Sequence, residues 1–203
     1  MLTFHQGHLT EYLWPRSLDQ IRDLSRQECL FEVVERTGTT NIIVGACYIT
    51  HAKEIEPPFA ERNEFGGIYV SDDCRGLGLA TALGFVAIGN LFMVDPPKGR
   101  LIAHVHEENS LPRRVLKQQG FVQNGQEIPP RSVVPLSMKR NKDGDVVGDL
   151  FVFDTTSLTT IADWIHNFPG TINGKNGKSL LEIELPSFAR MRADLVKALR
   201  DRA

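Results

Sequence analysis

The hydrophobic pattern of the chain alternates between short β-type segments and longer helical ones. The predicted order is a helix from Ser17, strands over 30–35, 41–50 and 65–70, a helix over 77–94, a strand over 101–106, a helix over 110–119, and strands from 121 and over 133–138. Ser17 and Gln20 form a capping-box pattern that marks the start of the first helix. This order predicts a mixed α/β (α+β) fold with helices layered on a sheet.

A polar stretch over 141–148 is typical of a linker. Beyond it the pattern predicts a strand over 150–153, a helix over 158–167, a strand with Leu181, Ile183 and Leu185 on one face, and a helix with an apolar stripe of Phe188, Met191, Leu195 and Leu199. We therefore predict a domain over 1–140 and a strand–helix–strand–helix extension over 149–203. About 55 residues are too few for a comfortably stable core, so the extension is expected to pack on the domain or on a second subunit.

The segment 77–94 has no charged residue and is long enough to raise the question of a membrane span. It contains Gly78, Gly84, Gly89 and Asn90, however, and it follows a strand directly. A helix buried against a sheet also needs an apolar surface on nearly all sides. We therefore predict a buried helix and no membrane association.

Composition narrows the function classes. The 203 residues carry 23 Lys+Arg and 25 Asp+Glu, a net charge of −2, which argues against a nucleic-acid-binding protein. The 3 cysteines are scattered and no histidine cluster accompanies them, so a structural metal is not expected. Free cysteines and the lack of a secretory pattern at the first residues favour a reducing, cytoplasmic location.

One motif stands between a predicted strand and the apolar helix. It consists of Arg75, Gly76, Leu77, Gly78, Leu79 and Ala80. The first N–H groups of a helix have no partner within the helix, and the helix dipole adds positive potential there. Small residues let a phosphate approach those groups closely. The motif therefore predicts a pyrophosphate site, although a bare Gly-x-Gly turn can also serve packing alone.

The motif resembles the acyl-CoA-binding segment of the GNAT (Gcn5-related) N-acyltransferase superfamily, because Arg75, Gly78 and Ala80 match its Arg/Gln-x-x-Gly-x-Gly/Ala pattern. A second segment agrees, since Asn109 precedes Gly120 and Phe121 by the interval of the family's strand–Asn–helix–Gly-Phe block. The resemblance covers residues 10–140. It implies a mostly antiparallel mixed sheet flanked by helices, and acetyl-CoA or another acyl-CoA as co-substrate with no metal.

The resemblance also implies how the cofactor lies. The strands ending at Val70 and over 101–106 would splay apart and hold the pantetheine arm between them. A backbone N–H, that of Val70 in particular, would polarise the thioester, and Asn109 would bind the arm. A helix N-cap is the other interpretation of Asn109. The acceptor would be a small-molecule or protein amine, and a homodimer is compatible with the pattern.

An amine must be neutral to attack, and deprotonating a lysine-like amine at pH 7 costs about 4–5 kcal/mol. A general base is therefore expected. Glu64 is the first candidate because the family places a glutamate near the start of this strand, and Glu61 is close enough to replace it. His104 and His106 share one face of the next strand and form the second choice.

The family's usual acid is a tyrosine in the helix after Asn109, and Leu116 stands at that position. A thiolate can leave without protonation, so the absence of this tyrosine affects the rate of acyl transfer more than cofactor binding. A non-catalytic acyl-CoA-binding regulatory domain is therefore the alternative function. A Rossmann-type dinucleotide site is a more remote alternative function. Asp95 follows the glycines at a spacing suitable for binding a ribose, but residues 71–75 separate the strand from the first glycine.

Overall fold

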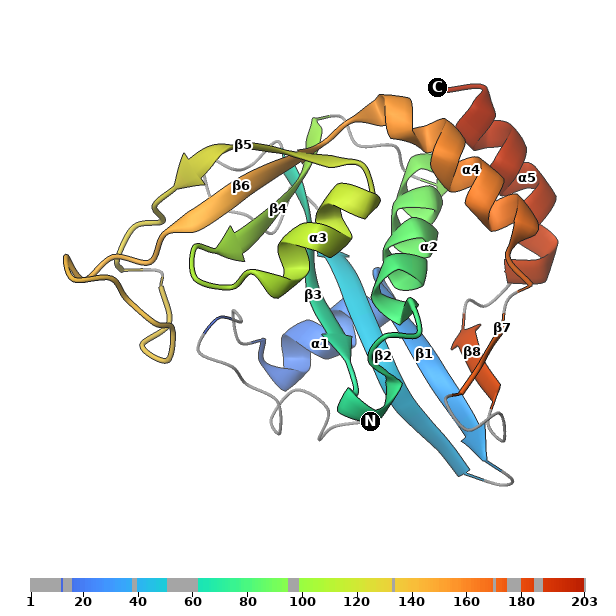
Figure 1. Cartoon of the computed structure of the whole chain (residues 1–203), viewed down its shortest axis with the longest axis horizontal. Helices are drawn as coiled ribbons and strands as arrows, with labels where there is room; N and C mark the ends of the chain where they lie inside the picture. The colour runs from blue at the N-terminus through green and yellow to red at the C-terminus, as the bar shows by residue number, and fades with distance from the viewer. Residues whose placement is uncertain are drawn as a thin grey trace.

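The segments with β-branched and aromatic residues form one sheet, and the apolar helix lies across it (Figure 1). The structure, a computed structural model, describes residues 12, 16–37, 40–50, 62–94, 99–132, 134–169, 171–174, 180–184 and 188–202. The elements are α1 (Leu18–Arg26), β1 (Leu30–Thr37), β2 (Thr40–Thr50), β3 (Arg62–Val70), the 3₁₀ turn η2 (Asp72–Cys74), α2 (Leu79–Val94), β4 (Arg100–His106), α3 (Leu111–Gln118), β5 (Phe121–Glu127), β6 (Gly148–Phe153), the 3₁₀ turn η3 (Thr155–Ser157), α4 (Leu158–Asn167), β7 (Thr171–Asn173), β8 (Leu180–Glu184) and α5 (Phe188–Arg200).

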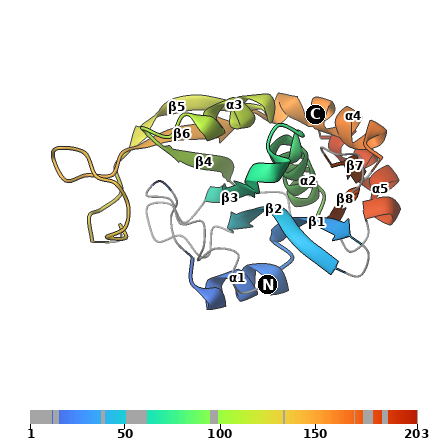
Figure 2. The same ribbon diagram turned by 60° about the horizontal axis from the view of Figure 1, so that its bottom comes forward.

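The sheet has 8 strands in the order β5-β6-β4-β3-β2-β1-β8-β7. Within the described strands only β3 and β4 are parallel neighbours, and the other pairs are antiparallel. Helix α2 packs on the sheet together with α3, α4 and α5, while α1 lies on the opposite face (Figure 2). The predicted mixed, mostly antiparallel sheet with flanking helices is confirmed.

The parallel pair β3–β4 separates after a short contact. Its register runs from Arg62 opposite Arg100 to Glu64 opposite Ile102, and the rest of β3 then pairs with β2 alone. The two strands thus diverge toward their C-terminal ends, as predicted. The region in which they diverge is called the wedge below, and it extends toward the end of β3, which η2 and the start of α2 follow.

A β-bulge shapes the strand that borders the wedge. The register of β2 and β3 shifts between Ala46 and Tyr48, and Gly67 opposite them has φ +61°. A Cβ at Gly67 would lie 2.0 Å from Cε1 of Tyr48, so only glycine lets that ring lie on the strand. The glycine pair in β3 therefore marks both a bulge and a close approach.

Helix α2 is buried, as its uniform apolar composition predicts. Every residue from 82 to 89 is buried, because the helix lies between the sheet and the helices α3, α4 and α5. In the described part of the chain, no helix combines the length and the apolar character needed to cross a bilayer.

One expectation about the second half of the chain needs correction. The predicted strand over 133–138 is wrong: residues 134–138 form turns, and Val134 and Met138 pack with Val146 in a small separate cluster. Pro129 and Pro130 precede this segment and Pro135 lies within it, and proline cannot donate to a strand ladder. The sheet is completed instead by β6.

The predicted division into 1–140 and 149–203 has no counterpart in the strand order. Strand β6 lies between β5 and β4, so a strand assigned to the extension is interior to the sheet. Strand β8 pairs with β1 at Val33 opposite Ile183, and α5 packs on α4 and α2. The sheet therefore continues across the predicted boundary.

A glycine in α2 fixes how closely α3 approaches. Gln119 is fully buried at the end of α3 and donates from Nε2 to the carbonyl of Ala80 at 2.9 Å. A Cβ at Gly84 would lie 1.9 Å from that Nε2. The absence of a side chain at Gly84 is therefore what lets the amide of Gln119 reach α2.

We expect Gly84→Ala to destabilise the protein by about 1–3 kcal/mol, because the new methyl group would push the Gln119 amide off Ala80 in a packed interior. Urea unfolding measures the effect. The double variant Gly84→Ala, Gln119→Ala should be more stable than the sum of the two single changes, since the smaller side chain makes room for the methyl group. Simple additivity would contradict this explanation.

Candidate active site

The turn from Arg75 to Ala80, called the cofactor turn below, presents open backbone at the start of α2. Gly76 and Gly78 have φ +85° and +79°, and a Cβ added at either would meet no atom within 4 Å. The first helical hydrogen bond runs from Ala82 N to Gly78 O, so the N–H groups of 79–81 precede it. An anion can therefore approach these N–H groups, and the helix dipole favours it.

Arg75 lies at the edge of this turn. Its Nη2 is 2.8 Å from Oδ1 of Asp72, and both side chains are exposed. An exposed pair of this kind contributes about 0–1 kcal/mol, so a phosphate can compete for the guanidinium. The predicted phosphate-binding residues therefore lie together at one helix start.

The backbone of Val70 points into the wedge. Ser71 N donates to Val44 O at 2.8 Å, and Val70 is opposite Gly45 in the next pair of the ladder. Because N–H groups alternate in direction along an antiparallel pair, the N–H of Val70 points away from β2. Val70 is six residues from Glu64, or about 20 Å along the strand, so both cannot touch one reacting carbonyl. A group in contact with Glu64 is therefore out of reach of the N–H of Val70.

Asn109 lies between the wedge strand β4 and α3. Its N–H donates to His106 O at 2.8 Å, and the side chain is half-buried. Ser110 directly precedes α3 and makes no side-chain cap hydrogen bond, and the helix-cap interpretation of Asn109 stays a prediction. Leu116, at the family's tyrosine position, is only 1% exposed and packs in the main core. That position therefore offers no proton donor.

Four charged side chains meet where β3 and β4 begin to separate. They are Arg62, Glu64, His104 and Glu127, called the ion cluster below. Nδ1 of His104 is 3.0 Å from Oε1 of Glu64, and Nε2 is 3.1 Å from Oε2 of Glu127. Arg62 Nη1 donates to Oε1 of Glu127 at 2.7 Å. The structure thus brings together Glu64 and His104, the first two candidates for the base.

The cluster favours a protonated His104. Burial alone would lower the pKa of His104, but the contacts with Glu64 and Glu127 outweigh it and raise this pKa above the usual value. Burial likewise would raise the pKa of Glu127, and Arg62 and His104 lower it instead. Because both ring nitrogens face carboxylates, the imidazolium satisfies both contacts.

His106 has a different environment from His104. It is 7% exposed, and its Nδ1 accepts from the N–H of Glu108 at 3.2 Å. Its Nε2 is 2.9 Å from Lys139 O and must donate to that carbonyl. Both ring nitrogens of His106 are thus bound to backbone groups, whereas those of His104 face carboxylates. Glu61 lies outside the described residues.

Sequence reasoning missed Glu127 and Arg62. Glu127 lies on β5 and reaches His104 across β6, a contact between strands that no local pattern predicts. Within the described residues, no group of three or more His, Cys, Asp or Glu side chains has an arrangement suited to a metal ion.

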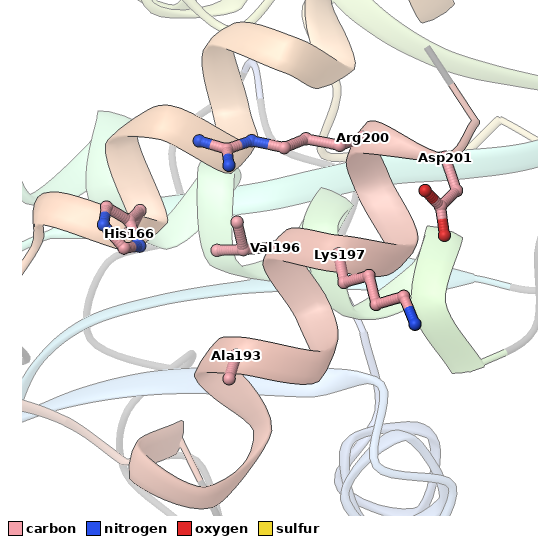
Figure 3. A pocket seen from close by; sticks show the side chains of 6 residues that line it. All are labelled: His166, Ala193, Val196, Lys197, Arg200 and Asp201. Carbon is pink, nitrogen blue, oxygen red and sulfur yellow. The ribbon is translucent and has the colours of Figure 1, made fainter.

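A separate cleft of about 340 Å³ lies between α4 and α5 (Figure 3). It is lined by His166, Ala193, Val196, Lys197, Arg200 and Asp201. None of these residues belongs to the cofactor turn or the ion cluster.

No protein-family model and no curated protein matches the sequence. Solved structures do match. The NatC complex bound to Gag peptide and CoA has 20% identity and a TM-score of 0.53, covering 75% of this chain and 87% of that chain. Arabidopsis thaliana NAA60 with acetyl-CoA has 15% identity and a TM-score of 0.55, covering 75% and 90%. Ribosomal-protein-S5-alanine acetyltransferase from Vibrio fischeri has 18% identity and a TM-score of 0.51, covering 75% and 85%.

Proposed function

We infer that this protein, whose fold is that of the GNAT acetyltransferases, transfers an acyl group from an acyl-CoA to an amine. One observation carries the inference: β3 and β4 pair only from Arg62 to Glu64, beside the ion cluster, and they diverge toward the end of β3, from which the chain continues to the open cofactor turn. This arrangement supports a nucleotide pyrophosphate at the turn and a proton acceptor at the ion cluster, with the donor between them. Acetyl-CoA is the proposed donor, since the similar NAA60 structure holds it.

The chain's own residues would bind the donor along the wedge. The N–H groups of the cofactor turn and Arg75 would hold the pyrophosphate. The N–H of Val70 and the side chain of Asn109 would hold the pantetheine arm. Backbone N–H groups nearer the bulge at Gly67 are better placed than Val70 to stabilise the oxyanion.

The ion cluster would supply the proton acceptor. An acceptor ammonium group at the point where β3 and β4 begin to separate would contact the carboxylate of Glu64 and the ring of His104. Neutral His104 would take the proton, and the thiolate would leave without help from position 116. The pKa of His104 lies above its usual value, so we propose that turnover rises as the pH increases through this pKa.

A protein N-terminus is the acceptor class that we propose first, and a small amine second. The NatC structure has a bound peptide, and the Vibrio fischeri enzyme is named for a ribosomal-protein alanine. A regulatory acyl-CoA-binding domain without turnover is the other candidate function, and buried Leu116 favours it because the usual acid is missing.

Calorimetric titration with acetyl-CoA, CoA and NAD tests the donor site. We expect binding of both CoA compounds and none of NAD; NAD binding without CoA binding would overturn the proposal. Release of free thiol from acetyl-CoA, measured with a panel of peptide N-termini and small amines, then separates the two functions. Binding without release for any amine would favour the regulatory domain.

A further inference from the structure

The contact between His104 and Glu127 crosses an intervening strand. His104 is on β4, Glu127 is on β5, and β6 lies between them. Gly148 of β6 pairs with both His106 and Glu127 at this crossing. A Cβ at Gly148 would lie 3.6 Å from Cδ2 of His104, so any larger side chain would occupy the space beside the ring. At this crossing β6 thus presents no side chain beside the ring, and the carboxylate of Glu127 on the edge strand reaches His104.

The two carboxylates on His104 are not equivalent. Each oxygen of Glu127 has its own partner, Arg62 at Oε1 and His104 at Oε2. Glu64 contacts His104 through Oε1 and makes no other side-chain ion pair among the described residues. Glu127 is thus held from two sides, while Glu64 is held from one and faces the point where β3 and β4 separate. This asymmetry gives the two ring nitrogens different roles.

We propose that Glu127 is a positioning residue that holds Nε2–H of His104, so that proton exchange occurs at Nδ1 and Glu64 receives the ammonium group of the acceptor. The proposal rests on the proposed acyl transfer. Arg62 fixes Glu127, and Glu127 in turn fixes the tautomer and the direction of the ring. Glu127 itself touches neither substrate.

In the proposed step the acceptor ammonium loses two protons and gains one C–N bond. The acceptor ammonium replaces the Nδ1–H···Glu64 contact once His104 is neutral, and it gives one proton to Nδ1. The nitrogen lone pair forms the C–N bond with the thioester carbonyl carbon. The C–S bond breaks, and the second proton from the nitrogen leaves with the sulfur as free thiol. The products are the amide, CoA thiol and protonated His104.

The charges around His104 predict opposite effects for two neighbouring changes. Glu64 faces it from β3 and Glu127 from β5, and Arg62 of β3 contacts Glu127. Strand β6 contributes uncharged Gly148 and Leu150, and His106 on the same strand as His104 is bound to Lys139 O. Glu127→Gln removes a negative charge and should lower the pKa of His104 by about one pH unit. Arg62→Gln removes the positive charge that partly neutralises Glu127, so Glu127 attracts a proton on His104 more strongly and the pKa of His104 should rise. Loss of folding would not produce opposite shifts.

The experiment titrates the His104 ring by NMR in the full chain and measures the pH profile of thiol release. Glu35→Gln, a half-buried strand glutamate on β1, serves as the matched control and should change neither. We expect the acid limb of the profile to move with the NMR pKa in Glu127→Gln and Arg62→Gln, in opposite directions. We also expect Glu127→Ala to lower turnover at every pH while leaving acetyl-CoA affinity within twofold.

The outcomes distinguish the positioning role of Glu127 from the proposed acyl transfer. An NMR pKa of His104 that does not respond to Glu127→Gln overturns the positioning role, whatever the enzyme does. Responsive NMR pKa values in a protein that releases no thiol with any amine overturn the acyl transfer instead. Full turnover of Glu127→Ala at all pH values also overturns the positioning role. Comparing the NMR pKa of His104 in Gly148→Val and in Gly148→Ala is a second check, because only the larger valine side chain should separate His104 from Glu127.

Discussion

Gly78→Val is expected to weaken acetyl-CoA binding by roughly tenfold or more. Gly78 has φ +79°, a conformation in which a β-branched side chain is strained. Its missing Cβ meets nothing in the protein, so the new side chain would project into the space that the pyrophosphate needs. Calorimetric titration with acetyl-CoA measures the loss.

Gly125→Val is the matched control for this change. Gly125 also has a positive φ, +92°, and open space at its Cβ, but it lies on β5 away from the cofactor turn. It should carry similar strain and leave the affinity for acetyl-CoA unchanged. Equal losses in both variants would mean that strain alone acts, and the phosphate site would have to be placed elsewhere.

Glu64→Gln should reduce turnover by about 10²-fold or more with little change in acetyl-CoA affinity. The change removes the charge that would receive the acceptor ammonium and keeps the shape of the side chain. Loss of the Glu64 charge also lowers the pKa of His104, so the rates are best compared on the alkaline plateau, where His104 is neutral in both proteins. Steady-state thiol release over a range of amine concentrations separates kcat from KM.

Glu35→Gln again provides the control, and it should retain normal turnover. A Glu64→Gln protein as active as the unchanged one on the plateau would remove Glu64 from the mechanism and leave His104 with solvent as the proton acceptor.

Most helices and strands could be predicted from the sequence because residues at their ends, such as capping residues, mark where they begin and end. The capping box at Ser17 is present, with Gln20 N donating to Ser17 Oγ at 3.2 Å. Helix α4 has the predicted bounds of 158–167. The strand predicted over 133–138 does not form because Pro135 lies within this apolar run, and proline has no N–H to donate to a ladder.

In the candidate site as well, the part that lies in one local motif could be predicted and the part that depends on strand order could not. Gly76 and Gly78 lie in one continuous motif, so a sequence pattern is enough to bring them together. The contact of His104 with Glu127 depends on β6 entering between β4 and β5, and on Gly148 arriving at the crossing. Strand order and register are set by tertiary packing, and a single sequence contains no local signal for them.

The pairing of β1 with β8 has a consequence for the order in which the chain can fold during synthesis. Val33 finds its partner Ile183 only after 150 further residues have been made. Until then one edge of β1 carries unpaired N–H and C=O groups, and β4 is in the same situation until Leu150 emerges to pair with His104. Contacts of such long sequence separation are slow to form, and open strand edges attract other chains meanwhile. The nascent protein should therefore depend on chaperones that shield β-strand edges late in translation.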